Sequence, residues 1–214
     1  MHIFYHIHSP DLYAKLNFLR YHPKSRLIMM VREPIQNCES WLRNQFQGNK
    51  EFWVRNQFGG NEYDLIVHRI IKLLFDIDQV PFQTQDSVGI RLEDLKTRPE
   101  ATIRSMCEWI GVDEAPSLYR MTAQGKKWWG DPSSPDYDKN KAMSPFDGAC
   151  IERSVGTVFS EMDQLVLRTL FYPFSIKFGY AEPNPTKFKK NLMEIPRLLN
   201  NMLDFEREIA ERSK

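Results

Sequence analysis

A short apolar run followed by an arginine and a proline is the feature of this sequence that most constrains its fold. Residues 26–31 read Arg-Leu-Ile-Met-Met-Val, and residues 32–34 read Arg-Glu-Pro. A continuous apolar run of this length is typical of a strand that is buried on both faces. Pro34 suits the first residue of a helix, and we expect that helix to extend to about Phe46.

The segments around this run alternate between strand and helix patterns. Residues 2–8 are dense in β-forming residues, and residues 11–21 have apolar side chains at helical spacing. Strand, helix, strand and helix in succession are typical of a parallel α/β sheet. The sequence therefore predicts an α/β fold with a central parallel sheet flanked by helices.

Further elements follow the same pattern toward the carboxyl end of the chain. The sequence predicts a helix over 62–79, a strand over 87–92, a helix from Pro99 to Ile110 that Gly111 ends, a loop over 123–149, a helix over 159–178 that Pro173 breaks or kinks, and an amphipathic helix over 186–214. We expect residues 1–182 to form one α/β domain and residues 183–214 to form a helical tail.

Composition excludes several classes of function. The 214 residues carry 29 Lys plus Arg against 28 Asp plus Glu, a net charge of +1, which argues against a large nucleic-acid interface. No apolar stretch is long enough to span a bilayer. Three well-separated cysteines without a Cys-x-x-Cys pair predict free thiols in a reducing, cytoplasmic compartment. The Asp131, Asp136 and Asp138 spacing lacks the EF-hand glycine and glutamate, so we expect no metal.

Arg32 and Ser40 are the first candidates for a binding site. Arg32 follows a buried strand, and ligands bind at the carboxyl ends of strands in open α/β sheets. A guanidinium there suits a phosphate, and the amino end of the helix from Pro34 adds positive potential. Ser40 lies about 9 Å along that helix from Pro34. A phosphate that bridges Arg32 and Ser40 would therefore lie against the flank of the first turns of the helix. Arg32 could instead pair with Glu33 or Glu39, with Ser40 facing solvent.

Three segments together resemble a known family. Val31-Arg32-Glu33-Pro34 with Ser40 resembles the 3′-phosphate signature of sulfotransferases that use 3′-phosphoadenosine 5′-phosphosulfate (PAPS). The block from Glu93 to Val112 and the segments 153–156 and 178–180 are similar to later motifs of the same family. The order and spacing of these segments imply a P-loop-like sulfotransferase fold over most of residues 5–180.

The resemblance implies a reaction and roles for four residues. Arg32 and Ser40 would hold the 3′-phosphate of PAPS, with Arg153 as a second phosphate ligand. His8, in His6-Ile7-His8-Ser9-Pro10, would be the general base that takes the proton of a hydroxyl or amine acceptor. His8 also fits a histidine at a strand end whose nitrogens bind backbone groups. The acceptor would be a small molecule or a glycan, and no metal is needed.

The glycine-containing loop with which such enzymes hold the 5′-phosphosulfate has no match in these residues. We therefore expect an amino-terminally truncated fold, with an exposed sheet edge through which a homo-oligomer could form. A non-catalytic module that binds the nucleotide or another subunit is the alternative function. A kinase-like protein is less favoured, because no Gly-x-x-x-x-Gly-Lys-Ser/Thr motif occurs.

Overall fold

A computed structural model of the protein describes residues 12–46, 86–123, 126–128, 137–140, 144–146, 148, 151, 155–199 and 203–212. The strand predicted over 2–8, which contains His8, and the helix predicted over 62–79 lie outside these residues. None of the helices within the described ranges is long and apolar enough to cross a membrane.

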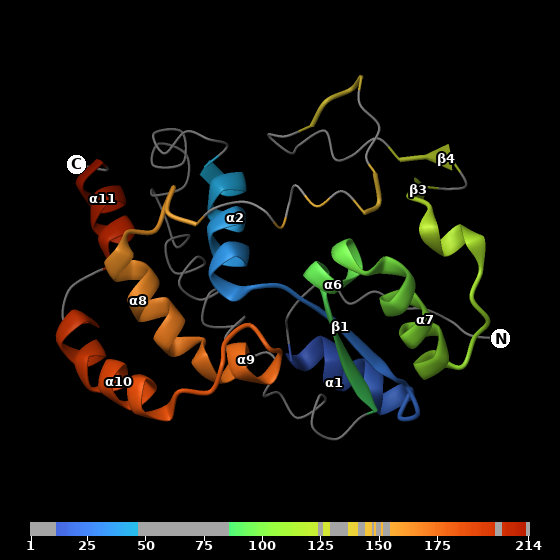
Figure 1. Cartoon of the computed structure of the whole chain (residues 1–214), viewed down its shortest axis with the longest axis horizontal. Helices are drawn as coiled ribbons and strands as arrows, with labels where there is room; N and C mark the ends of the chain where they lie inside the picture. Colours follow the sequence, from blue (N-terminus) through green and yellow to red (C-terminus); the bar gives the residue numbers. More distant parts are fainter. Residues whose placement is uncertain are drawn as a thin grey trace.

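Two parallel strands form the described part of the central sheet. Strand β1 (Leu27–Val31) pairs with β2 (Ser87–Arg91) from Leu27↔Ser87 to Val31↔Arg91, and the two lie side by side in Figure 1. Both strands and their parallel pairing agree with the α/β fold that the sequence predicts. Because the strands run in one direction, Val31 and Arg91 end at the same edge of the sheet.

The two faces of β1 differ in burial, which corrects one expectation. Val31 is 4% exposed and packs with Met29 against Phe174, whereas Ile28 and Met30 on the opposite face are 38% and 53% exposed. The apolar run therefore does not bury both faces of the strand. Side chains alternate across a strand, so only the face with Met29 and Val31 packs against the aromatic rings of Phe174, Phe178 and Tyr180.

Proline and glycine mark several helix boundaries as predicted. Helix α1 spans Leu12–Tyr21, α2 spans Pro34–Phe46, and α7 spans Pro99–Ile110. Gly111 ends α7 in the left-handed conformation, at φ 81°, and its N–H donates to the carbonyl of Cys107. The proline at the start of α2 and α7 fits the first helical turn, where its missing N–H has no partner to lose.

Helix α6 (Leu92–Thr97) is an element that the sequence reading missed. Leu92, assigned above to the strand, is its first residue, and Glu93 and Asp94 lie in its first turn. Acidic side chains at a helix amino end stabilise it, which explains why the strand ends at Arg91. A 3-10 turn (Pro116–Tyr119) and a hairpin of β3 (Thr122–Ala123) and β4 (Lys126–Lys127) follow α7.

The carboxyl-terminal part is helical and contacts the domain. Helices α8 (Glu161–Leu170) and α9 (Tyr172–Lys177) replace the predicted helix over 159–178, and Pro173 lies in the first turn of α9. The tail forms two helices instead of one, α10 (Pro185–Leu199) and α11 (Asp204–Arg212). Both pack against α8, which lies between α2 and α10 in Figure 1.

Asp163 connects the beginnings of two of these helices. Its backbone N–H donates to the Ser160 hydroxyl, and its carboxylate accepts the Ser160 N–H, which is a capping box at the start of α8. The same carboxylate accepts the backbone N–H groups of Asp204 and Phe205 at 2.6 and 3.1 Å. The Asp163 side chain is fully buried, so these donors replace the water that the carboxylate loses.

The larger apolar core holds α2 against α8 and α11. Ile35, Cys38 and Leu42 recur at helical spacing on one face of α2 and are at most 1% exposed. They meet Phe159, Phe171 and Phe205, and the Phe159 and Phe205 rings pack edge to face at 5.2 Å. Because its apolar face is buried here, α2 presents a different face toward the sheet edge.

Gly89 allows a close approach that a side chain would block. A Cβ atom at Gly89 would overlap the Phe178 ring. We expect Gly89→Ala to lower the free energy of unfolding by about 1–3 kcal/mol, as measured by urea denaturation. In a Phe178→Leu background the same change should cost less, because the ring is gone. Equal costs in the two backgrounds would contradict this close packing.

Candidate functional site

The candidate site lies where the two parallel strands end. Val31 and Arg91 are in register, Arg32 follows Val31, and α2 and α6 begin at this edge. Loops at the carboxyl ends of parallel strands are the usual place for ligands in open α/β sheets.

Arg32 is bound to Gln36, one turn later in the chain. The Nε–H of Arg32 donates to Oε1 of Gln36 at 3.0 Å, and Nε2 of Gln36 donates to the carbonyl oxygen of Ile151 at 2.9 Å. Gln36 is only 8% exposed, whereas Arg32 is partly exposed. Sequence reasoning missed Gln36. Its position four residues after Arg32 was the available signal, but its second partner lies 115 residues away.

Ser40 lies on the same side of α2 as Gln36. The two are four residues apart, so their side chains project from one face on successive turns. Ser40 is partly buried. The structure therefore arranges Arg32, Gln36 and Ser40 along one flank of the helix.

Carboxylates occupy the first backbone donors of α2. The N–H of Glu33 donates to Oε1 of Glu93 at 2.9 Å, and the N–H of Gln36 donates to Oε2 of Glu33 at 2.6 Å. Arg168 lies 3.5 Å from the other oxygen of Glu33. Since these amides have anionic partners within the protein, an incoming phosphate would meet the flank of the helix and its side chains.

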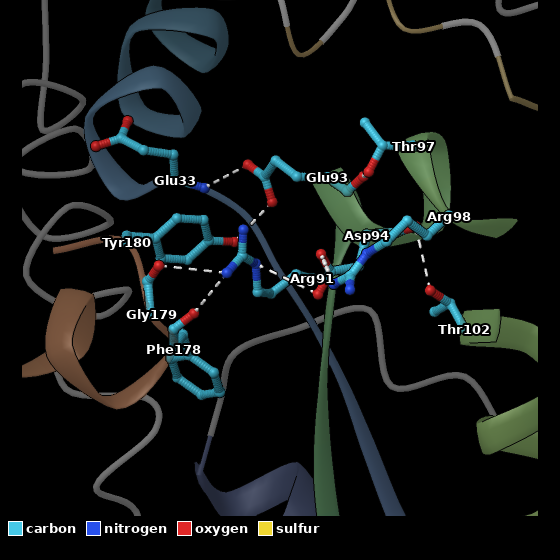
Figure 2. A network of polar contacts seen from close by, with 10 residues as sticks. All are labelled: Glu33, Arg91, Glu93, Asp94, Thr97, Arg98, Thr102, Phe178, Gly179 and Tyr180. Carbon is cyan, nitrogen blue, oxygen red and sulfur yellow. Dashed lines mark hydrogen bonds and ion pairs between the residues drawn. The ribbon is translucent and has the colours of Figure 1, made fainter. Parts of the chain in front are cut away.

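Figure 2 shows the network that Glu93 joins. Its Oε2 accepts the hydroxyl of Tyr180 at 2.7 Å, while Oε1 accepts the Glu33 N–H. The Arg91 guanidinium lies over the Tyr180 ring at 4.7 Å and donates from Nη1 to the carbonyls of Phe178 and Gly179. Burial, with the hydrogen bond to Glu93, raises the pKa of Tyr180 well above its ordinary value. Tyr180 is therefore a neutral donor at physiological pH.

Helix α6 has its own ion pairs beside this network. Asp94 lies 2.7 Å from Nη2 of Arg98 and 3.5 Å from Nε of Arg91. Its backbone carbonyl accepts from Arg98 and from the Thr102 hydroxyl. The two neighbouring carboxylates thus point in different directions (Figure 2). Glu93 points toward Tyr180 and the start of α2, whereas Asp94 points toward the start of α7.

Glu39 holds the loop that precedes α8. Its carboxylate accepts the backbone N–H groups of Gly156 and Thr157, the Thr157 hydroxyl and the N–H of Phe159, at distances up to 3.3 Å. Gly156 has φ 122°, a conformation that residues with a side chain rarely adopt. Glu39 is 3% exposed. Burial acts to raise its pKa, but the donors from Thr157, Gly156 and Phe159 outweigh burial and hold the pKa below its usual value.

Two of the four predicted site residues lie outside the described part of the chain, namely His8 and Arg153. The described residues on either side of Arg153 both contact α2, because Ile151 accepts from Gln36 and Gly156 donates to Glu39. Glu33 and Glu39, considered above as ion-pair partners of Arg32, have Arg168 and the Gly156–Phe159 loop as partners.

The cysteines in the described residues are buried and free. Cys38 and Cys107 form no disulfide. Burial raises the pKa of the Cys38 thiol to about 12, so the thiol stays protonated and is a poor nucleophile. Among the residues that the structure describes, no three metal-ligating side chains gather at one place.

The known proteins to which this chain is similar are sulfotransferases. A family model described as Sulfotransferase family matches residues 6–116. No curated protein matches the chain significantly. The sulfotransferase domain from the curacin biosynthetic pathway is similar in structure, with a TM-score of 0.51 and 16% sequence identity. That match covers 81% of this chain and 60% of the other, so the chain spans about three fifths of that domain.

Replacing Glu39 should weaken the fold in a pH-dependent manner. At neutral pH we expect Glu39→Gln to lower the free energy of unfolding by about 2–3 kcal/mol, because a carboxamide cannot accept all of these N–H donors. The folded-state pKa lies below the ordinary 4.5. The stability that the Glu39 carboxylate contributes is therefore complete at pH values above the ordinary pKa, and it is lost as pH falls through the lowered pKa of the folded state.

Urea titrations of the wild-type protein and of Glu39→Gln, at pH 7 and at acidic pH, would measure the gap between their free energies of unfolding. The same substitution at exposed Glu182 serves as the control and should have little effect at either pH. A gap that stays constant down to the most acidic measurable pH would contradict the role of the carboxylate.

Replacing Tyr180 by phenylalanine isolates its hydroxyl. Phenylalanine keeps a ring beneath Arg91, so the change removes only the bond to Glu93. We expect Tyr180→Phe to cost about 1–2 kcal/mol of unfolding free energy, and less in a Glu93→Gln background, as measured by urea denaturation. Tyr21→Phe, at a side chain that is 75% exposed, is the control and should change little.

Proposed function

The chain belongs to the sulfotransferase family, and from this premise we propose that it transfers a sulfuryl group from PAPS to a hydroxyl or amine acceptor. The observation that carries the proposal is the arrangement of Arg32, Gln36 and Ser40 along one flank of α2, at the carboxyl end of β1. A cation just before α2 and a hydroxyl about two turns further along offer a phosphate both charge and hydrogen bonds.

Arg32 and Ser40 would bind the 3′-phosphate of the nucleotide. The carboxylates nearest the start of α2 support this assignment, because Glu33 and Glu93 are engaged with protein donors. Arg153 is proposed as a second phosphate ligand. In support, the chain is tied to α2 on both sides of it, at Ile151 and at Gly156.

His8 is proposed as the general base. The acceptor oxygen or nitrogen would form a bond to sulfur while the bond from sulfur to the bridging phosphosulfate oxygen breaks. His8 would take the proton that the acceptor loses. The products are the sulfated acceptor and adenosine 3′,5′-bisphosphate, and no metal is required for this transfer.

The remaining features of the proposal follow from the family and the composition. Residues 1–182 would form the sulfotransferase domain and residues 183–214 a helical tail that packs against α8. The acceptor would be a small molecule or a glycan. The free thiols of Cys38 and Cys107 support a reducing, cytoplasmic setting. Association into a homo-oligomer is part of the proposal, and nucleic acid is not a proposed partner.

Substitution of the two phosphate ligands tests the proposal. Calorimetry with adenosine 3′,5′-bisphosphate should show a loss of affinity of about 10- to 100-fold in Arg32→Ala and of about 5- to 10-fold in Ser40→Ala. Arg104→Ala is the control, since that arginine is 61% exposed on α7 and pairs with Glu114. Unchanged affinity in Arg32→Ala would overturn the assignment of the phosphate site.

Turnover separates the two candidate functions. Transfer of the sulfuryl group from labelled PAPS, lost in His8→Ala, is expected of the enzyme. Retained bisphosphate affinity without any transfer would favour the nucleotide-binding or subunit-interaction module instead. Absence of nucleotide affinity in the wild-type protein would count against both.

A further inference from the structure

Gln36 has a buried polar side chain that contacts Arg32, the arginine proposed to bind the phosphate. Its Oε1 accepts from Nε of Arg32 at 3.0 Å, and its Nε2 donates to the carbonyl oxygen of Ile151 at 2.9 Å. With an exposed fraction of 8%, the side chain amide relies on such partners for its hydrogen bonds.

The chemistry of its partners fixes the orientation of this amide. A guanidinium only donates hydrogen bonds and a carbonyl oxygen only accepts them. The amide oxygen must therefore face Arg32, and the amide nitrogen must face Ile151. A rotation of the amide by half a turn would place like groups against each other at both ends and lose both bonds.

The backbone beside Arg32 is fixed from the other direction. The N–H of the next residue, Glu33, donates to Glu93, and Val31 before it is paired with Arg91 in the sheet. Arg32 is thus held through its main chain by β2 and α6, and through its side chain by Gln36.

Orientation of the guanidinium matters for binding a phosphate. An arginine that is free to rotate loses side-chain entropy when a ligand orders it. Part of that loss already occurs in the folded protein when Nε is bonded. An end-on approach through Nη1 and Nη2 is the mode of bidentate phosphate binding that keeps the bond to Gln36.

We propose that Gln36 is a positioning residue that orients Arg32 for the 3′-phosphate by linking its Nε to the Ile151 carbonyl. Through this link, recognition of the 3′-phosphate depends on a residue that does not contact it. The inference rests on the proposed function, because the anion that Arg32 would bind is the 3′-phosphate of the nucleotide.

Two ligands distinguish a positioning role from a structural one. Adenosine 3′,5′-bisphosphate carries the 3′-phosphate and adenosine 5′-phosphate lacks it. Measured by calorimetry, Gln36→Met should weaken binding of the bisphosphate about tenfold and that of the monophosphate less than about twofold. An equal loss for both ligands, or no loss for either, would overturn the inference.

Gln164→Met is the matched control for this substitution. Gln164 on α8 also donates from Nε2 to a backbone carbonyl, that of Phe159 at 3.2 Å. The control should leave the affinity ratio of the two nucleotides unchanged. A shift of that ratio equal to the one in Gln36→Met would show a general effect of losing a glutamine side-chain hydrogen bond and overturn the inference.

A double-mutant cycle tests whether Gln36 acts through Arg32. In an Arg32→Lys background, Gln36→Met should weaken binding of the bisphosphate by less than about twofold more, because the Nε–H that Gln36 holds is absent. Additive losses would overturn the inference. If Gln36→Met does not fold, Gln36→Asn keeps the amide but is too short to reach both partners, and the same pattern is expected.

A nuclear magnetic resonance measurement gives a readout without ligand. The Nε–Hε signal of Arg32, identified by its absence in Arg32→Lys, should move toward those of exposed arginines in Gln36→Met. An unmoved signal would overturn the inference even if the nucleotide binds. If the wild-type protein binds no nucleotide but the signal does move in Gln36→Met, the proposed function and the phosphate-binding role are both rejected. The contact between Gln36 and Arg32 would still be confirmed, so this outcome is distinct from a failure of the positioning contact.

Discussion

The hydrogen bond from the Glu33 N–H to the Glu93 carboxylate is the interaction on which the site depends. It joins the segment that leaves β1 to the segment that leaves β2, just beyond the paired residues Val31 and Arg91. The second oxygen of Glu93 binds Tyr180, whose ring supports the guanidinium of Arg91. One carboxylate thereby fixes three segments that meet at the sheet edge, and the position of Arg32 follows from theirs.

Helix α2 makes apolar and polar contacts side by side. Ile35, Cys38 and Leu42 are buried in the core with α8 and α11. Beside them, Gln36 and Glu39 bind loop residues from far along the chain. Their amide and carboxylate groups are almost fully buried, and each is matched by donors or acceptors of the opposite kind. The helix therefore fixes the site through polar contacts that the apolar core alone could not specify.

The features that the sequence predicted are those written in local residue patterns. Pro34 and Pro99 start helices, Gly111 ends one, and the apolar run before Arg32 forms a strand. These signals act within a few residues, so composition and spacing reveal them. The motif around Arg32 and Ser40 is equally local, which is why the family resemblance could be read from it; its role in binding a phosphate stays a prediction.

The features that escaped prediction depend on distant partners. Glu39 binds Gly156 and Thr157 across separations of 117 and 118 residues, and nothing near Glu39 marks it as a loop anchor. Helix α6 forms where an apparent strand continued through Leu92, because the acidic first turn favours a helix. The exposed face of β1 was also unreadable, since burial depends on which segments cover the sheet.

The buried carboxylate of Asp163 ties helix α11 to the rest of the globule. It accepts the backbone N–H groups of Ser160, Asp204 and Phe205, so the same carboxylate caps the amino ends of both α8 and α11. A protease that cut the chain ahead of α11 would leave that charge in an apolar interior with two fewer donors. The last helix is thus an integral part of the globule, not a removable appendage.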